Sequence, residues 1–339
     1  MESNDLQTTA TRSFLDDLEV QGRSDRTIDA YRRVLADFEA FLLRRYDESN
    51  PGTATYRDCL RWVDSIRSDH AESTVATYAS YLHRFYEYMA SVGEFQDNPM
   101  SMVVEEMSES IDSDPTRRDL ALSDVRAFVD QIDHPLEGAV VVTLLKTGIR
   151  AGELCNLDQR DLVLDSDPRS IEPRGQLDSR GAALFVASVP TRGATYRGEQ
   201  RLESNKRQRD TVIPVDDELE SAIRRWLAIR PDPQGPARPL FTRTSASWGQ
   251  RLRIETVHRI VTDHAATMGW YREGASAGEN VTPHYFRHFF TTHLRDRTGE
   301  RGIVQYLRGD VAQDVLDTYT HNWGQRVREV YLDAIYSLY

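Results

Sequence analysis

Two stretches in the N-terminal third share a helical spacing of apolar residues, and this pattern most constrains how the region can fold. The first stripe consists of Ile28, Tyr31, Leu35, Phe38 and Leu42. The second repeats the spacing with Val75, Tyr78, Leu82, Phe85 and Met89. Apolar side chains spaced three and four residues apart line one face of an α-helix and need a surface to pack against. The pattern therefore predicts a bundle of amphipathic helices.

A third helix is predicted between the two stripes, over residues 56–66. The residues of this helix that are expected to face the core of the bundle are Tyr56, Leu60, Val63 and Ile66. Polar residues that favour helix N-caps precede both stripes, in Ser24-Asp25 and Glu72-Ser73. The aromatic residues on the stripes are interpreted as core rather than as platforms that stack on DNA bases. The region is thus predicted to form four or five helices ending at Asn98-Pro99.

The chain of 339 residues is predicted to form two domains, since a domain takes roughly 150 residues. Residues 1–10 are polar and are expected to be a disordered tail before a helical domain over residues 11–105. Residues 106–119 are acidic and rich in serine, which is typical of a linker. The second domain is expected over residues 120–339, with Ser123 as the N-cap of its first helix.

Within the second domain, residues 161–215 differ in composition from the apolar helical segments around them. Two runs rich in β-formers, residues 183–189 and 211–215, flank the polar stretch 192–210. Such runs predict paired strands. A buried helix is expected near residues 136–145, and the chain after residue 216 returns to a helical pattern. The predicted fold class is therefore mainly α with a small antiparallel β-sheet.

The sequence shows no sign of a membrane or secreted protein. No run of about 18 apolar residues is present, so no membrane span is predicted. The first residues lack the basic and apolar regions of a signal peptide. Cys59 and Cys155 are the only cysteines, too few for a disulfide framework or a cysteine zinc site. A reducing cytoplasm is the expected location.

Acidic residues outnumber basic ones, and arginine almost replaces lysine. The net charge is −12, and only Lys146 and Lys206 among the 42 basic residues are lysines. This composition is expected of a protein adapted to high salt. High salt suppresses the part of DNA affinity that comes from counterion release. If such a chain binds DNA, the affinity would then depend on close bidentate contacts between arginine and phosphate.

Arg150 and Arg287 each lie in a mostly apolar context, where a charge needs a partner. A planar guanidinium contacts two phosphate oxygens at once and stays protonated. A pair of such arginines suits the negative charge that develops when a phosphodiester is attacked. The alternative for either residue alone is a structural ion pair with an acid such as Glu153.

Lys206 stands out because 40 of the 42 basic residues are arginines and Lys146 is the one other lysine. A lysine releases a proton more readily than an arginine, whose pKa is above about 12. Lys206 is therefore a candidate general acid for a departing 5′-oxygen. Lys146 shows that a lysine also occurs elsewhere in the chain, so chance placement is the alternative.

His284 and Arg287 are three residues apart on a predicted helix and are expected to face one pocket. Pro283 favours a helix start at this point, where backbone amides attract an anion. A zinc site at His284 and His288 is the alternative. No glutamate lies between these histidines, so the metalloprotease pattern is missing.

Taken together, these segments resemble the tyrosine recombinase (phage integrase) family along nearly the whole chain. The N-terminal unit resembles the family's SAM-like core-binding domain, and Lys206 precedes Pro214 by the eight residues typical of the family's β-hairpin lysine. The resemblance implies a catalytic domain in which Glu153 orients Arg150. It implies four catalytic residues before the nucleophile, namely Arg150, Lys206, His284 and Arg287.

The resemblance assigns the nucleophile to Tyr319. The family has a tyrosine nine residues after the histidine of a Leu-x-Gly-His motif, and Leu307-Arg308-Gly309-Asp310 stands at that motif here. Attack by the phenol would link the protein to a 3′-phosphate and free a 5′-hydroxyl. The bond energy is kept in the ester, so no metal, ATP or other cofactor is expected.

Asp310 is the main departure from the family pattern, because a carboxylate replaces a histidine. An ionised carboxylate cannot donate a hydrogen bond to a phosphate. It can accept the proton of Tyr319, or hold His288 or Arg308 in place. Alternatively, His321 or Trp323, just past Tyr319, supplies the missing donor.

The implied activity is site-specific recombination of double-stranded DNA by a dimer to tetramer of this chain, with no membrane and no small-molecule substrate. One alternative is a type IB topoisomerase-like activity. Another is a sequence-specific DNA-binding protein whose catalysis is weakened or lost, which Asp310 motivates. The apolar stripe from Val327 to Leu338 is expected to pack either on its own domain or on a neighbouring copy.

Overall fold

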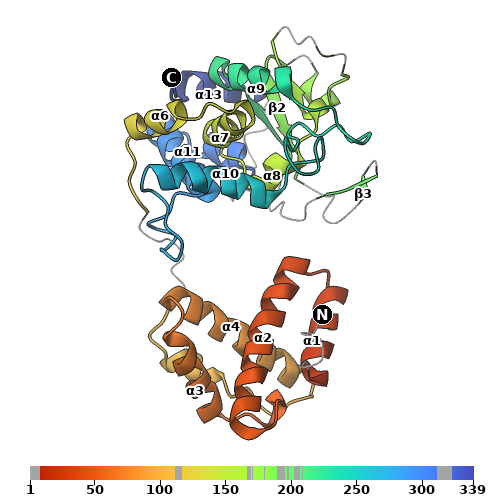
Figure 1. Ribbon diagram of the computed structural model, residues 1–339, viewed down its shortest axis with the longest axis vertical. Helices are drawn as coiled ribbons and strands as arrows, with labels where there is room; N and C mark the ends of the chain where they lie inside the picture. The colour runs from red at the N-terminus through yellow and green to blue at the C-terminus, as the bar shows by residue number, and fades with distance from the viewer. Residues whose placement is uncertain are drawn as a thin grey trace. The chain divides into compact units, whose positions relative to one another are not determined.

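The computed structural model describes residues 8–110, 117–165, 169, 171–178, 180–188, 195–196, 198–201, 207, 209–310 and 323–339. The chain forms two compact units, Met1–Pro115 and Thr116–Tyr339 (Figure 1). Each unit has a hydrophobic core of its own. In the part of the chain so described, no helix is both long enough and apolar enough to span a bilayer.

The smaller unit is a helical bundle built on the two apolar stripes. Its helices are α1 (Thr9–Val20), α2 (Asp25–Tyr46), α3 (Tyr56–Arg67), α4 (Glu72–Ser91) and α5 (Ser101–Glu106), with the 3-10 turn η1 (Pro51–Thr53) after α2. Helices α2 and α4 carry the stripes, and α1 packs against both. Ser24 caps α2, because its hydroxyl accepts a hydrogen bond from the amide of Thr27. Helix α4 instead begins after Ala71, without a side-chain cap.

Aromatic residues of the stripes form the centre of this bundle. Phe38 is fully buried and makes edge-to-face contacts with Trp62 and Tyr86, with ring centroids 5.4 and 6.2 Å apart. Burial of a side chain of this size contributes about 1.5–3 kcal/mol. Tyr31 and Phe85 are also buried, whereas Tyr78 is half-buried. The interpretation of the buried stripe aromatics as core is confirmed.

The inward face of α3 differs from the prediction. Leu60 is exposed, and Cys59 and Trp62 face the core together with Val63 and Ile66. A shift of one residue rotates the buried face of a helix by about 100°. The ring of Trp62 contacts Phe38 of α2 and the thiol of Cys59 is fully buried, so packing between helices decided the face.

The ends of the smaller unit also differ from the predictions. Helix α1 begins at Thr9, inside the segment expected to be disordered, because Thr8 caps it. The hydroxyls of Thr8 and Thr11 both donate to the buried Glu39 carboxylate at 2.6 Å, which ties this end to α2. The bundle also continues beyond Pro99, since α5 follows and Val103 is buried in the core.

The larger unit is organised around α7 (Pro135–Thr147), which is buried along nearly its whole length (Figure 1). It packs mainly against α9 (Asp217–Ile229) and α11 (Pro283–Thr298). A helix that is apolar on every side belongs in a core. The remaining helices are α6 (Leu122–Asp130), α8 (Ala151–Asn156), α10 (Ile254–Thr267), α12 (Arg301–Arg308) and α13 (Trp323–Ala334).

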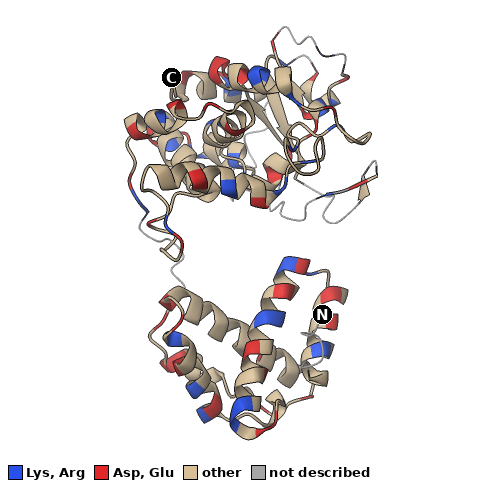
Figure 2. Cartoon of the chain, viewed as in Figure 1, with Lys and Arg blue, Asp and Glu red and all other residues tan. Residues whose placement is uncertain are grey.

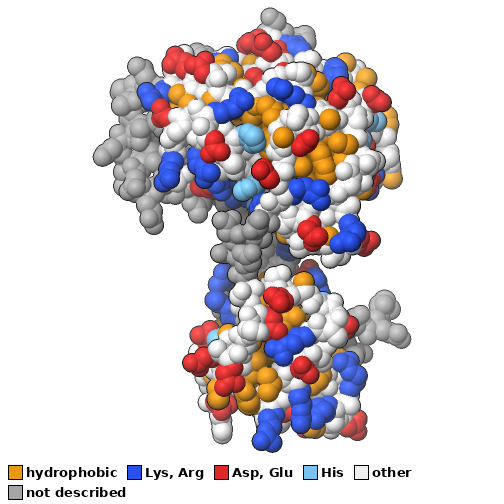
Figure 3. Space-filling view, turned by 90° about the vertical axis from the view of Figure 1, so that its left-hand side faces the viewer, with side chains coloured by type: hydrophobic (Ala, Val, Ile, Leu, Met, Phe, Trp, Pro, Cys, Tyr) orange, Lys and Arg blue, Asp and Glu red, His pale blue; other side chains and the backbone are white. Residues whose placement is uncertain are grey.

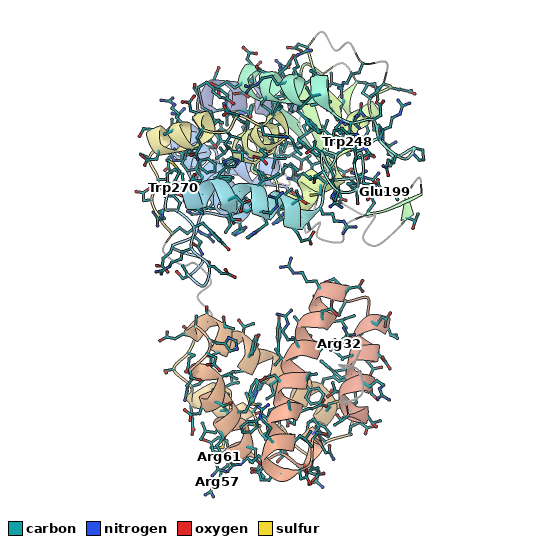
Figure 4. The ribbon with its side chains drawn as sticks, in the orientation of Figure 1. Arg32, Arg57, Arg61, Glu199, Trp248 and Trp270 are labelled. Carbon is teal, nitrogen blue, oxygen red and sulfur yellow. The ribbon has the colours of Figure 1, made fainter. Side chains whose placement is uncertain are left out.

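The N-cap of helix α6 lies two residues before the predicted cap. It is Ala121, and Ser123 lies inside the helix. The carboxylate of Asp124 accepts the amide of Ala121 at 3.0 Å and so satisfies the helix end in place of a serine hydroxyl. Trp270, labelled in Figure 4, stacks on Phe128 of α6 with ring centroids 5.5 Å apart.

A three-stranded antiparallel sheet lies beside these helices. Its strands are β1 (Leu162–Val163), β2 (Ala183–Val186) and β5 (Thr211–Pro214), in the order β1-β2-β5. Leu184 pairs with Ile213, and both face the main core. A separate pair, β3 (Thr195–Tyr196) and β4 (Glu199–Gln200), lies within the polar stretch. The predicted fold class is confirmed, but strands of two residues carry no periodicity and were not predicted.

The C-terminal residues pack on their own unit. Tyr331 and Tyr336 are fully buried, and their hydroxyls donate to the carbonyl oxygens of Lys146 and Leu145 at 2.8 and 2.5 Å. Val327 and Leu338 are buried in the same core. Of the two arrangements left open for the C-terminal stripe, the structure has the one within the chain.

Acidic and basic side chains are intermixed over both units (Figure 2). The face in Figure 3 shows the same mixture. In the smaller unit, Arg57 and Arg61 project outward from α3, and Arg32 lies on α2 (Figure 4). A net charge of −12 is therefore compatible with local groups of arginines.

Candidate active site

The C-terminal end of α7, the start of α8 and the first turns of α11 meet around the predicted arginines. Gly148 ends α7 in the left-handed region, with φ of 62°. A Cβ at this position would lie 2.3 Å from the ring of Phe290 in α11. Only glycine permits both the turn and this close approach. The turn makes Arg150 the N-cap of α8 and brings it beside α11.

Glu153 holds Arg150 in two ways. One carboxylate oxygen accepts the amide of Arg150 at 3.0 Å, and the other accepts Nη1 of its side chain at 3.1 Å. Glu153 is buried, and burial acts to raise its pKa. The charge of Arg207, the Arg150 amide and the Arg150 charge outweigh burial, so the pKa of Glu153 lies below its ordinary value. The carboxylate is therefore ionised at pH 7.

Arg207 is part of this site and was not predicted. Its buried guanidinium donates to Glu153 at 3.2 Å, to Thr211 Oγ1 at 2.7 Å and to the carbonyl of Leu307 at 3.2 Å. Gly309 makes room for it, because a Cβ there would lie 2.4 Å from Arg207. In a chain with 40 arginines, one more arginine beside Lys206 carries no signal of its own.

Arg287 is also buried in the site. Its Nη1 donates to the carbonyl of Gly148 at 2.8 Å, and its Nη2 donates to the carbonyl of Arg308 at 3.1 Å. Burial lowers the pKa of Arg287 to about 9, and the charge of Arg150 acts in the same direction. Arg287 is therefore still cationic at pH 7.

Asp310 closes the site on the side of α12. Its Oδ1 accepts Nη2 of Arg287 at 3.2 Å and lies 3.9 Å from Nη2 of Arg150. Its Oδ2 lies 2.9 Å from Nε of Arg308. The structure thus brings together three of the predicted residues, namely Arg150, Arg287 and Asp310. Of the two partners suggested for Asp310 in the sequence, the contact with Arg308 is present.

His284 lies in the first turn of α11, which begins at Pro283 as predicted. Desolvation lowers the pKa of His284, and the charges of Arg117, Arg287 and Arg150 lower it further. The imidazole is therefore neutral at pH 7. Arg117 belongs to the segment predicted as a linker, and its neighbour Arg118 is tied to α11 because the hydroxyl of Tyr285 donates to the Arg118 carbonyl at 2.8 Å.

Lys206 and Tyr319 lie outside the described residues, as does His321. The side chain of Trp323 is likewise not described. In the segments that the structure covers, no three His, Cys, Asp or Glu side chains gather as a metal site requires. The described part of the site is therefore a group of guanidinium ions around the carboxylates of Glu153 and Asp310.

Comparison with known protein families gives two matches. Residues 122–326 match the Phage integrase family, and residues 12–93 match the N-terminal SAM-like domain of phage integrases. Tyrosine recombinase XerC of Thermodesulfovibrio yellowstonii is 24% identical over 94% of this chain and 93% of its own length. Tyrosine recombinase XerA of Pyrococcus furiosus is 24% identical over 97% of this chain and 95% of its own length.

Solved structures of integrases share the fold. The Tn1549 transposon integrase in complex with a circular intermediate DNA has a TM-score of 0.64 at 16% identity, covering 95% of this chain and 99% of that one. A lambda integrase dimer bound to a COC′ core site has a TM-score of 0.62 at 14% identity, covering 91% and 96%. At these identities the likeness concerns the fold alone.

Proposed function

Because the chain belongs to the phage integrase family, we propose that it is a site-specific DNA recombinase that cleaves and rejoins DNA through a 3′-phosphotyrosine at Tyr319. The observation that carries the proposal is the convergence of Arg150, Arg287 and Arg308 on one anionic group. Guanidinium groups fixed in advance around an anion stabilise the extra charge of a phosphorane-like transition state. No bound metal is required for this neutralisation.

The reaction assigns one role to each group. The phenolic oxygen of Tyr319 attacks phosphorus, and the bond from phosphorus to the 5′-oxygen breaks. His284 is neutral at pH 7 because its pKa is lowered, so it can accept the phenolic proton. Lys206 supplies a proton to the departing 5′-oxygen. Rejoining is the reverse reaction, in which a 5′-hydroxyl attacks the phosphotyrosine.

The proposal of Lys206 as the general acid is supported by the contacts of the next residue, Arg207. Arg207 is anchored to Glu153, which also holds Arg150. Lys206 directly precedes Arg207 in the sequence. A lysine at this point can both neutralise charge and release a proton, whereas an arginine releases a proton poorly.

The test is formation of a covalent protein–DNA adduct on a nicked suicide substrate. Wild type is expected to accumulate the adduct. Tyr319→Phe is expected to lose it, because this substitution removes the attacking phenolic oxygen and no other atom of the ring. Tyr339→Phe is the matched control, since Tyr339 is also a late tyrosine and is exposed. An adduct that survives in Tyr319→Phe would reject the assignment of the nucleophile.

Two other functions share parts of this site. A type IB topoisomerase-like enzyme would use the same residues, and it would relax supercoiled plasmid as a monomer without site preference. A sequence-specific DNA-binding protein with lost catalysis is motivated by Asp310, whose carboxylate faces Arg287 and Arg150. Specific binding without an adduct at any salt concentration would favour that function.

We further infer the partners and setting of the enzyme. The lambda integrase relative is a dimer on a core site and a tetramer on a Holliday junction, so we propose double-stranded DNA and further copies of this chain as partners. The net charge of −12 and the near-absence of lysine support a salt-adapted, archaeal-type member. Cys59 and Cys155 are free and buried, which suits a reducing cytoplasm.

A further inference from the structure

The carboxylate of Asp310 lies where three guanidinium groups converge. It is 2.9 Å from Nε of Arg308, 3.2 Å from Nη2 of Arg287 and 3.9 Å from Nη2 of Arg150. A carboxylate and a phosphodiester both present oxygens that accept charge-assisted hydrogen bonds from arginine. The group of atoms around Asp310 is therefore an anion site that already holds an anion from the protein.

Asp310 covers the outer side of this site. Arg287 has only 3% of its side chain exposed, whereas Asp310 has 32% exposed. The inner donors of Arg287 are bound by the carbonyl oxygens of Gly148 and Arg308. Arg150 is held from the other side by Glu153. The N–H donors of Arg287 and Arg150 that these contacts do not use therefore lie on the side of Asp310.

The contacts made by Asp310 are weaker than the site could provide. The separation of 3.9 Å from Arg150 is too long for a hydrogen bond. Nε of Arg308 is buried and has no hydrogen bond of good geometry among the described residues, although the carboxylate is close. An anion with more oxygens, bound closer to the guanidinium groups, would accept hydrogen bonds from Arg150 and from Nε of Arg308 that this carboxylate does not accept with good geometry.

The backbone at this point is fixed, so only the side chain has to move. Gly309 caps α12 in the left-handed region with φ of 74°, and the amide of Asp310 donates to the carbonyl of Gln305 at 3.0 Å. Rotation of the partly exposed carboxylate into solvent would open the arginine site without unfolding the helix end.

We propose that Asp310 is an internal competitor of the substrate phosphate, which fills the arginine site of the free protein and must be displaced when phosphate binds. The identity of the anion as a DNA phosphate rests on the proposed function, whereas the competition itself does not. The carboxylate balances the repulsion between Arg150, Arg287 and Arg308 until substrate arrives. It also lowers the affinity of the site for every other anion.

The test measures binding of inorganic sulfate by isothermal titration calorimetry, at constant ionic strength in chloride. Asp310→Asn keeps the size of the side chain and removes its charge, and it is expected to bind sulfate about tenfold more tightly than wild type. Asp310→Glu retains a competing carboxylate and is expected to stay within about twofold of wild type. Asp296→Asn is the matched control, because Asp296 is an exposed acid on α11 that pairs only with Arg295 among the described residues.

Equal or weaker sulfate binding in Asp310→Asn would overturn the proposal and would instead make Asp310 a residue that positions the arginines. If Asp310→Asn does not fold, Asp310→Ser removes the same charge at a partly exposed position and is subject to the same criterion. Sulfate binding is independent of strand cleavage. If Asp310→Asn binds sulfate more tightly but wild type forms no adduct with DNA, the proposed function alone is rejected. If wild type forms the adduct but Asp310→Asn binds sulfate as wild type does, the competition alone is rejected.

Discussion

Arginine and lysine are used for different geometries in this protein. Arg287 is planar and contacts two carbonyl oxygens and one carboxylate that lie around its fork. Lys146 presents a compact ammonium to three acceptors, namely Asp216 and Glu218 at 2.6 Å and the carbonyl of Tyr336 at 2.5 Å. An ammonium has three donors and suits such a cluster, whereas a guanidinium has a wider, flat fork. Lys146 thus has a structural reason for being a lysine.

At the same scale, the lowered pKa of His284 predicts how stability depends on pH. In the unfolded chain the pKa of a histidine is about 6.5. Desolvation and the charges of Arg117, Arg287 and Arg150 lower the pKa of His284 in the folded protein. The neutral ring therefore stabilises the fold fully above pH of about 6.5, and this contribution is lost as the pH falls toward the folded pKa.

His284→Gln, which is neutral throughout, removes this dependence. The free energy of unfolding of wild type relative to His284→Gln should stay constant above about pH 7 and fall as the pH is lowered below about 6.5. Urea unfolding at several pH values measures the difference, in which the other histidines cancel. A difference that stays flat or rises on acidification would contradict the prediction.

At the scale of elements, the end of α7 is shared by the site and by the C-terminal residues. Lys146 lies four residues before Arg150 and is bound by α9 on one side and by Tyr336 on the other. Tyr331 and Tyr336 close over the same helix end through the carbonyls of Lys146 and Leu145. Packing of the C-terminal residues within the chain is therefore coupled to the turn that positions Arg150.

Lys146→Met tests how much the contacts of Lys146 contribute to the free energy of unfolding. The substitution leaves Asp216, Glu218 and the Tyr336 carbonyl without their common donor, and loss of one partner from a buried ion pair costs about 3–5 kcal/mol. Urea unfolding is the measurement. Lys146→Arg keeps the charge but overfills the space, so a smaller loss of about 1–3 kcal/mol is expected. Stability of Lys146→Met within about 1 kcal/mol of wild type would show that the ammonium is not needed.

At the scale of the whole molecule, charge and stability are linked through the 54 acidic and 42 basic residues. A net charge of −12 destabilises the compact state by self-repulsion, and salt screens that repulsion. The Debye length falls from about 10 Å at 0.1 M salt to about 3 Å at 1 M. Salt should therefore stabilise this protein, whereas it weakens phosphate contacts to DNA.

The free energy of unfolding is accordingly expected to rise as KCl increases from 0.1 to 1 M. Urea unfolding at fixed pH measures it. Substituting exposed acids such as Asp263 and Asp296 by asparagine provides the control, since a less acidic variant should gain less from salt. Stability that is unchanged or lower at 1 M KCl would contradict both the prediction and the proposal of salt adaptation.

Much of the fold follows from local pattern. The stripes of α2 and α4, the fully apolar α7 and the Pro283 start of α11 are each encoded within one stretch of chain. The face of α3 was mispredicted because Leu60 and Cys59 are both apolar, and only the neighbouring helices discriminate between them. Strands β1, β3 and β4 have two residues each, too few for any repeat.

The sequence by itself determined which chemistry this chain is equipped for, because Arg150, His284 and Arg287 stand in local contexts that give each a role. Only the tertiary structure decided what surrounds them. Arg207 reaches Glu153 from 54 residues away, and Asp310 reaches Arg287 from 23 residues away. Contacts at such separations depend on how α7, α11, α12 and β5 pack, and no local periodicity encodes that packing. The departure of Asp310 from the family pattern was visible in the sequence, but its place inside the arginine site was decided by the fold.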